Sequence, residues 1–418
     1  MSIRSGLVIA VAALGFLGAG WAAPAAAQGA GCTGGGKISK QIAKQMSAAQ
    51  DAMKAKKWQE VLTRTREAEG VAGAKSQFDQ YWMYEFRGYA YHNLKQPAEA
   101  ARELEAALNS PCMPEANKLE RYKSLAGLYS SLRNYPKVID YGNRALKVAR
   151  DPDMMVQVAQ AYYQTGNNKD AVRVMNELLN GMEQSGRVPK EQQLLLIVAA
   201  CQKAGDNNCV SRVFEKLVQH YPKPDYWSNL TVALTATDVD DLQNLNVMRL
   251  GLQVNVLKKP SQFKEFAQLS LEEKLACEAQ TVLEQGFARK IFVEKRDVDV
   301  NTRLLDLAKK ECAADKAALP KNEAAAKAAA TGDALVKVGA QYLAAGDAAK
   351  AIPALQAGIA KGVAKGDPNE AKRQDEANIL LGMAYLKANN KGEAAKAFRK
   401  ATKDPTMMRI AKLWLLNT

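Results

Sequence analysis

The sequence has little of the chemistry that enzymes and metal sites rely on. Its 418 residues include only 2 histidines, His92 and His220, and these are far apart in the chain. It also lacks a His-Glu-x-x-His motif, a Cys-x-x-Cys motif, a nucleophile elbow and a phosphate-binding loop. We therefore expect the protein not to be an enzyme and to hold no cofactor or metal ion.

Segments typical of strands are also scarce. After the N-terminal region, clusters of β-branched residues bounded by turn residues are nearly absent. Alanine, leucine, lysine, glutamate and glutamine dominate instead, and these residues lose the least free energy on entering a helix. A chain of 418 residues exceeds what one compact core usually organises. The sequence therefore predicts an all-α protein that is divided into domains or built by repetition.

Charge of one sign is not concentrated anywhere in the chain. The formal net charge is +14, yet lysine and arginine alternate with acidic residues, and no block of five like charges occurs. Solvated helix faces explain this pattern better than a stripe that follows phosphates, so we expect no nucleic-acid partner. A peripheral basic surface that binds an acidic polysaccharide or a membrane stays an alternative.

The N-terminus has the pattern of a signal peptide over residues 1–27. An uncharged apolar run, Gly6–Ala22, precedes the small-residue cleavage site Ala25–Ala27, and residues 28–36 form a flexible, glycine-rich start of the mature chain. We expect a periplasmic or secreted protein. A membrane anchor is a weaker alternative, because the run is at the short end of the ~20 residues that a span needs. A lipoprotein modified on Cys32 is another, although the preceding residues lack a lipobox aliphatic residue.

A ladder of small and large apolar residues recurs along the chain. In the C-terminal copy, Leu381-Gly382 is followed by Tyr385, Ala394, Phe398, Ala401 and Pro405. Comparable ladders pass through Gly88, Ala126, Ala159 and Gly339, at roughly 33 to 43 residues per copy, which is the period of helical-hairpin arrays. Small residues let two helices approach closely while large ones fill the gaps beside them, and the apolar surface left over makes neighbouring hairpins stack.

This ladder resembles the tetratricopeptide repeat, whose consensus contains Leu-Gly, Ala-Tyr, a small residue, an aromatic residue and a closing proline. The resemblance implies an all-α fold, a right-handed superhelical solenoid of helix–turn–helix repeats. It covers residues 37–290, with about seven repeats, and residues 332–418, with two. Residues 291–331 fit no repeat and are expected to form an irregular helical connector, which makes the last two repeats a candidate second module.

The cysteines predict disulfide bonds. Their number, 6, is even, and the chain is expected to be exported. Cys201–Cys209 is the best local pair, because the two residues flank a turn between two helices. Cys277–Cys312 would pin the irregular segment, and Cys32–Cys112 is left by elimination. Buried free thiols are the alternative.

The resemblance also implies where a partner binds. The first helices of such repeats line a concave groove, and residues offset from the packing ladder face into it. The offsets select aromatic, amide and charged side chains: Trp82, Glu85, Tyr89, His92, Asn93, Lys123, Gln160, Tyr163, Gln164, Gln192 and Gln202. Such a mixture suits an extended peptide, whereas the plainer interpretation is that these residues cover the solenoid surface. We expect a non-catalytic scaffold or adaptor of the cell envelope that binds a protein or peptide.

In the C-terminal repeats the same offsets select an apolar strip: Val336, Ala340, Leu343, Ile379, Met383 and Leu386. An apolar strip is covered either by the rest of the chain or by a partner, and the sequence leaves both open.

Overall fold

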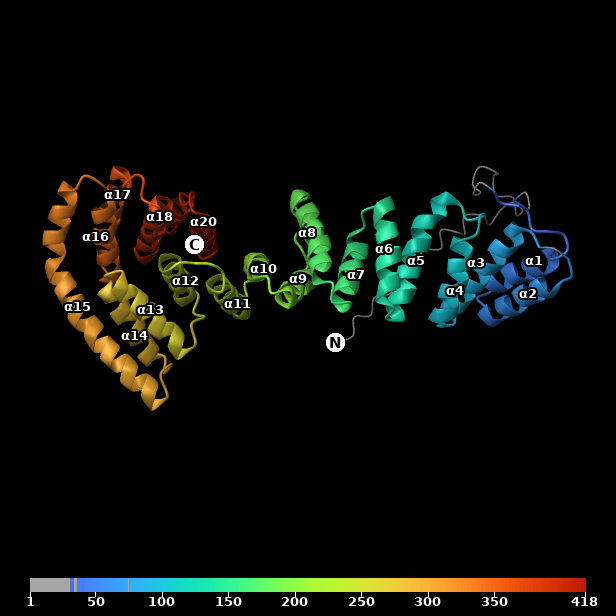
Figure 1. Ribbon diagram of the computed structural model, residues 1–418, viewed down its shortest axis with the longest axis horizontal. Helices are drawn as coiled ribbons and strands as arrows, with labels where there is room; N and C mark the ends of the chain where they lie inside the picture. Colours follow the sequence, from blue (N-terminus) through green and yellow to red (C-terminus); the bar gives the residue numbers. More distant parts are fainter. Residues whose placement is uncertain (1–30, 34–35, 74) are drawn as a thin grey trace. The chain divides into compact units, whose positions relative to one another are not determined.

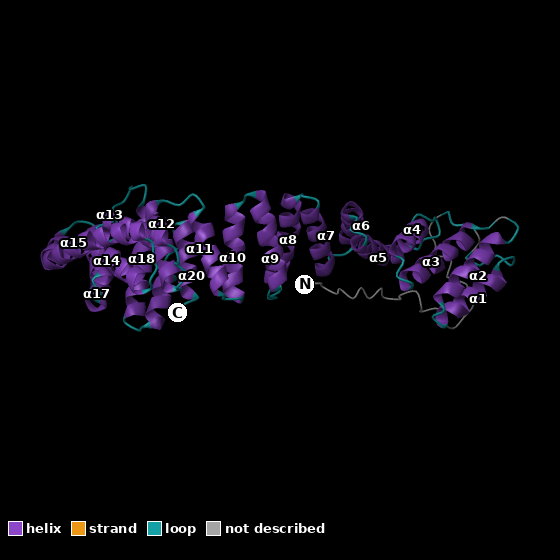
Figure 2. Cartoon of the chain, turned by 90° about the horizontal axis from the view of Figure 1, so that it is seen from below, coloured by secondary structure: helices purple, strands orange, loops and turns teal. Residues whose placement is uncertain are grey.

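The computed structural model describes residues 31–33, 36–73 and 75–418, so the expected signal peptide lies outside the described residues. Within these ranges the regular structure is helical and contains no strand, which confirms the predicted fold class (Figure 2). The helices, labelled in Figure 1, belong to two compact units, residues up to Ala204 and residues from Gly205.

Unit 1 is a series of helical hairpins in which each helix packs against the helix that follows it. Its helices are α1 (Ala43–Lys54), α2 (Trp58–Gly70), α3 (Gln77–Asn93), α4 (Pro97–Leu108), α5 (Lys118–Ser131), α6 (Tyr135–Val148), α7 (Pro152–Gln164), α8 (Asn168–Gln184) and α9 (Glu191–Ala204). The first helices of the hairpins are α1, α3, α5, α7 and α9. Contacts of α1 with α3 and of α7 with α9 bring successive first helices together.

The small residues of the ladder lie where two helices of a hairpin are closest. A Cβ atom added to Gly88 would lie 2.4 Å from Leu104 Cδ2, and one added to Gly382 would lie 2.4 Å from Phe398 Cε1. Neither position has room for a methyl group beside its large neighbour. The ladder therefore marks helix–helix contacts, as the sequence predicts.

The turns within the hairpins of unit 1 are less readable from sequence. Each contains a residue in the left-handed backbone region, with φ of 56° at Lys56, 59° at Lys95, 56° at Arg133 and 80° at Gly166. Glycine adopts this conformation without penalty, whereas side chains with a Cβ pay for it. Three of these four turns therefore use a basic residue where a turn signal would have glycine.

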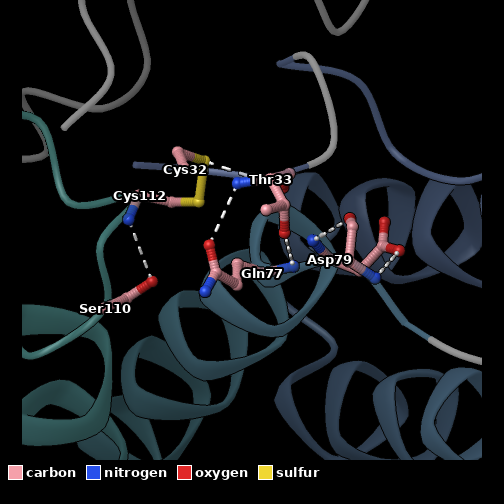
Figure 3. Close-up of a disulfide and its surroundings, with 7 residues drawn as sticks. Cys32, Thr33, Gln77, Asp79, Ser110 and Cys112 are labelled. Carbon is pink, nitrogen blue, oxygen red and sulfur yellow. Dashed lines mark hydrogen bonds between the residues drawn. A yellow bond between two sulfur atoms is a disulfide. The ribbon is translucent and has the colours of Figure 1, made fainter. Parts of the chain in front are cut away.

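A disulfide fixes the N-terminal segment to unit 1 (Figure 3). Cys32 is bonded to Cys112, with 4.7 Å between their Cα atoms, across a sequence separation of 80. Beside it, the Thr33 amide donates to Gln77 Oε1 at 3.0 Å, and the Phe78 amide donates to the Thr33 carbonyl at 3.1 Å. The alternative of a lipoprotein is contradicted in this oxidised state, because the Cys32 sulfur that would carry the lipid is already bonded.

Unit 2 also consists of consecutively packed helices, but its chain returns to an earlier helix. The helices are α10 (Asn207–His220), α11 (Pro224–Thr235), α12 (Asp241–Gln253), α13 (Pro260–Glu272), α14 (Ala276–Ala288), α15 (Lys295–Ala328), α16 (Asp333–Ala344), α17 (Ala348–Lys361), α18 (Glu370–Lys387), α19 (Lys391–Phe398) and α20 (Pro405–Leu415). Besides α18 and α19, helix α20 packs against α12 (Figure 1).

The expected irregular connector is a regular helix. Helix α15 runs unbroken for 34 residues, contains Pro320 and packs against both α14 and α16. A disulfide ties it to α14, since Cys277 is bonded to Cys312 with 4.6 Å between the Cα atoms. Because buried residues of α15 share one hydrophobic core with helices on both sides, the boundary between compact units does not fall at residues 291–331. It lies near residue 204 instead.

The last two repeats are likewise part of unit 2 and not a separate module, because charged groups tie them to α12. Arg249, whose side chain is 2% exposed, donates from Nε to Glu278 at 2.8 Å and from Nη1 to Glu376 at 3.2 Å. Burial disfavours the cation, yet the two carboxylates outweigh it and raise the pKa of Arg249. Burial also raises the pKa of Glu376. The three charges therefore join α12, α14 and α18 inside the unit.

A buried carboxylate positions the returning helix α20. Asp375 on α18 accepts hydrogen bonds from three consecutive backbone amides, those of Thr402, Lys403 and Asp404, at 2.7–2.9 Å. Asp404 then caps α20, and it also accepts from the Gln243 side chain of α12 at 3.1 Å. In the apolar strip of the C-terminal repeats, Ala340, Leu343 and Ile379 are buried by the chain itself, whereas Val336, Met383 and Leu386 are partly exposed.

Candidate partner-binding face

The predicted contact residues lie on the first helices α3, α5, α7 and α9 of unit 1, and we call this side the first-helix face. On α3, Trp82, Glu85, Tyr89 and His92 follow spacings of three and four residues, which place them on one side of the helix. The other residues of the face are Asn93, Lys123, Gln160, Tyr163 and Gln202. The availability of these side chains changes along the face from α3 to α9.

The aromatic part of the face, on α3, is packed against the protein itself. The Trp82 ring lies edge-on to three neighbours, Phe78, Tyr81 and Phe86, with centroids 5.5–6.2 Å apart. Tyr89 contacts Trp58 in the same manner at 5.5 Å. Neighbouring rings therefore cover part of Trp82 and of Tyr89, and their contact with a partner stays a prediction.

The polar residues of α3 also have intramolecular contacts. Glu85, whose side chain is 13% exposed, forms an ion pair with Arg121 of α5. The Asn93 side-chain amide donates to the Tyr89 carbonyl at 2.9 Å. Burial lowers the pKa of His92, so its imidazole is neutral at pH 7. Glu85 therefore joins α3 to α5, and both Glu85 and Asn93 have less capacity left for a ligand.

Interactions between successive first helices make the face continuous. Lys123 of α5 pairs at 2.8 Å with Asp151, the N-cap residue of α7. Between α7 and α9, the Lys203 ammonium lies 4.4 Å from the centroid of the Tyr163 ring, within the range of a cation–π interaction. The predicted residues Lys123 and Tyr163 are thus brought to the junctions between neighbouring hairpins.

The α7–α9 part of the face is the most accessible. Gln160 and Gln164 on α7, and Gln192 and Gln202 on α9, are exposed, and Tyr163 is half-buried between the two helices. Each glutamine side chain offers two N–H donors and an acceptor oxygen, which are the groups that pair with a peptide backbone. We call these four glutamines and Tyr163 the amide patch.

Two residues of this region escaped the sequence interpretation. Leu195 is 39% exposed on α9, three residues after Gln192 and seven before Gln202. Its helical spacing is the signal that could have identified it. Lys203 directly follows a selected residue, and only the fold reveals that its ammonium lies over the Tyr163 ring.

None of the helices in residues 31–33, 36–73 and 75–418 combines the length and the apolar character needed to cross a bilayer. The same ranges contain no cluster of three or more histidine, cysteine or acidic side chains placed to hold a metal ion.

Comparison with known proteins identifies one repeat directly. Residues 375–403, which cover most of α18 and all of α19, match the family model of the tetratricopeptide repeat. This segment is a tetratricopeptide repeat. It contains the ladder from Leu381 to Ala401 that carries the resemblance in the sequence. No curated protein matches the chain.

Several solved structures of tetratricopeptide repeat proteins are similar to the chain at low identity. One, from Parabacteroides merdae, is 13% identical with a TM-score of 0.32, covering 65% of this chain and 100% of that chain. The C-terminal part of another, from Cytophaga hutchinsonii, is 14% identical with a TM-score of 0.33, covering 62% and 93%. Similarity at this level does not extend to partners or function.

Proposed function

We propose that the protein is a non-catalytic scaffold or adaptor of the cell envelope that binds a protein or peptide on the first-helix face of unit 1. The observation that carries this proposal is the amide patch on α7 and α9, because it combines exposed glutamines with a half-buried tyrosine. Stacked helical hairpins present such side chains on a surface that does not have to fold around its ligand.

The proposed ligand is an extended segment. Glutamine side chains bond to backbone N–H and C=O groups of any sequence, and the Tyr163 ring on α7 and the exposed Leu195 on α9 each offer apolar surface to ligand side chains. The packed α3 region would act as a rigid support for the patch. We therefore place the main contacts on α7 and α9 and not on Trp82.

The state of the cysteines supports a location in an oxidising compartment. All described cysteines are bonded, including Cys201 and Cys209, and disulfides persist mainly in exported proteins. We propose a periplasmic or secreted protein that has lost residues 1–27. A non-reducing peptide digest is expected to yield a Cys201–Cys209 linked pair, and free thiols at these positions would contradict that pairing.

Site-specific crosslinking tests the binding face. A photoreactive residue at Gln160 or Gln202 is expected to crosslink one envelope protein in living cells, whereas the same residue at Asn180 or Gln184 of the second helix α8 is not. These control positions are also exposed amides of unit 1. Equal yields from both pairs of positions would contradict the proposal.

Substitutions in the amide patch measure how much it contributes to the affinity for the partner. Gln160→Ala with Gln202→Ala removes two amides, each worth about 0.5–1.5 kcal/mol, so binding is expected to weaken roughly tenfold. Asn180→Ala with Gln184→Ala is the matched control. If moderate salt abolishes binding while the patch variant has no effect, the alternative of a basic surface for an acidic polysaccharide or membrane is favoured.

A further inference from the structure

A second surface, in unit 2, has the features of a docking groove. An open hollow of about 370 Å³ lies between α13 and α15, two helices that contact each other. Six residues line it: Lys264 and Gln268 from α13, and Val300, Arg303, Leu304 and Leu307 from α15. None of these residues belongs to the first-helix face of unit 1.

The floor of this groove is an apolar stripe on α15. Val300, Leu304 and Leu307 are spaced by four and three residues, so they lie on one side of the helix. Leu304 is partly buried against the core of unit 2, whereas Leu307 is 45% exposed. A single exposed leucine is ordinary, but here three apolar side chains line the same hollow.

The rim of the groove is cationic and uncompensated. Among the described residues, no carboxylate lies within ion-pair distance of Lys264 or Arg303, and none lines the hollow. Within the described part of the chain, the Arg303 Nε donates to the backbone carbonyl of Asp299 at 3.3 Å. By contrast, Lys309 on the same helix pairs with Glu284. The groove therefore combines an apolar floor with two cations for which the described residues form no ion pair.

We propose that this groove binds an acidic amphipathic helix of a partner protein. The stripe from Val300 to Leu307 extends about 10 Å along α15, which matches roughly two turns of a helix. Such a helix places two or three large apolar side chains over the stripe and carboxylates beside Lys264 and Arg303, while the Gln268 amide bonds to its polar side. Opposite charge at the rim fixes its orientation and disfavours basic or neutral helices.

A charge swap tests this proposal with the mature chain. The probe is a fluorescent synthetic helix with three leucines on one face and glutamates beside them, and a second version has lysines in place of the glutamates. Fluorescence anisotropy is expected to show binding of the acidic version only. In the variant Lys264→Glu with Arg303→Glu, affinity for the acidic helix falls at least about tenfold, because two charge pairs become repulsive, and the basic version binds instead.

The matched control reverses two exposed cations of unit 2 that lie outside the groove, Lys316→Glu with Lys400→Glu, and is expected to bind the acidic helix normally. If circular dichroism reveals lost helicity in the groove variant, Lys264→Gln with Arg303→Gln is measured instead and must weaken binding. Equal binding of both helices, or an unchanged affinity in the groove variant, overturns the proposal. A third outcome also overturns it: the acidic helix fails to bind, and the chain instead associates with anionic lipid vesicles or with a second copy of itself in a way that Leu307→Glu abolishes.

Discussion

Removing the guanidinium of Arg249 should destabilise unit 2 far more than neutralising its partner Glu376. Arg249 is 2% exposed and pairs with two carboxylates, and those of Glu278 and Glu376 are 16% and 14% exposed. In Arg249→Met, both carboxylates would stay in the interior without a cation. Breaking a buried ion pair in this manner costs roughly 3–5 kcal/mol.

Glu376→Gln should have a smaller effect, because burial already raises the pKa of Glu376 and disfavours its charged form. The amide still accepts from Arg249, and Glu278 still balances the cation. A carboxyl whose folded pKa is raised holds its proton longer in the native state, so its contribution to stability falls as pH rises from about 4.3 through the folded pKa. Glu376→Gln cannot ionise and should remove this part of the pH dependence.

Hydrogen exchange measured by mass spectrometry can follow unit 2 separately from unit 1. Peptides from α12, α18 and α20 should exchange about 100-fold faster or more in Arg249→Met at pH 7, since each 1.4 kcal/mol corresponds to a factor of ten. Peptides from α3 and α5 serve as the internal control and should not change. Equal acceleration in Arg249→Met and Glu376→Gln would refute the reasoning that the cation is the critical member of the three.

Two further predictions concern unit 1. Replacing Cys32 and Cys112 by serine opens a loop of 80 residues, which should lower the free energy of unfolding by up to about 4.5 kcal/mol in a urea titration; no change in midpoint would contradict a structural role. Gly88→Ala should lower the free energy of unfolding by about 1–3 kcal/mol in a thermal melt, because its Cβ would lie 2.4 Å from Leu104. Gly181→Ala, with open space around it, should raise the free energy of unfolding by about 0.5–1 kcal/mol in the same assay.

The helical hairpins were readable from sequence because their cause is local. Gly88 and Gly382 stand at the same position of their repeats, because a methyl group there would collide with the facing helix. This requirement produces small residues at a regular spacing in the sequence. The turns at Lys56, Lys95 and Arg133 have no such sequence signal. These residues adopt the left-handed backbone although their side chains disfavour it, so the residue type does not predict the turn.

The return of α20 to α12 could not be predicted for a different reason. Gln243 of α12 and Asp404, which caps α20, are separated by 161 residues. Arg249 and Glu376, which join α12 to α18, are separated by 127. Neither side of these contacts has a periodic or motif-like signature, because a buried ion pair specifies only complementary charge. The long helix α15 misled the interpretation similarly: its charged residues obscure the apolar positions that pack on α14 and α16.

The residues predicted to contact a partner lie on first helices, but the sequence did not predict which of their side chains are available. Helical spacing gives the side of a helix on which a residue lies, and Glu85 and Gln160 satisfy that criterion equally. Availability depends on the neighbouring helix: Arg121 faces Glu85, whereas Gln160 is exposed. The same comparison separates Arg249 from Arg303 in unit 2. Arg249, with two carboxylate partners, holds the fold together. Arg303 lies beside an apolar hollow and has no carboxylate in ion-pair contact among the described residues, so we expect a ligand to supply the negative charge there.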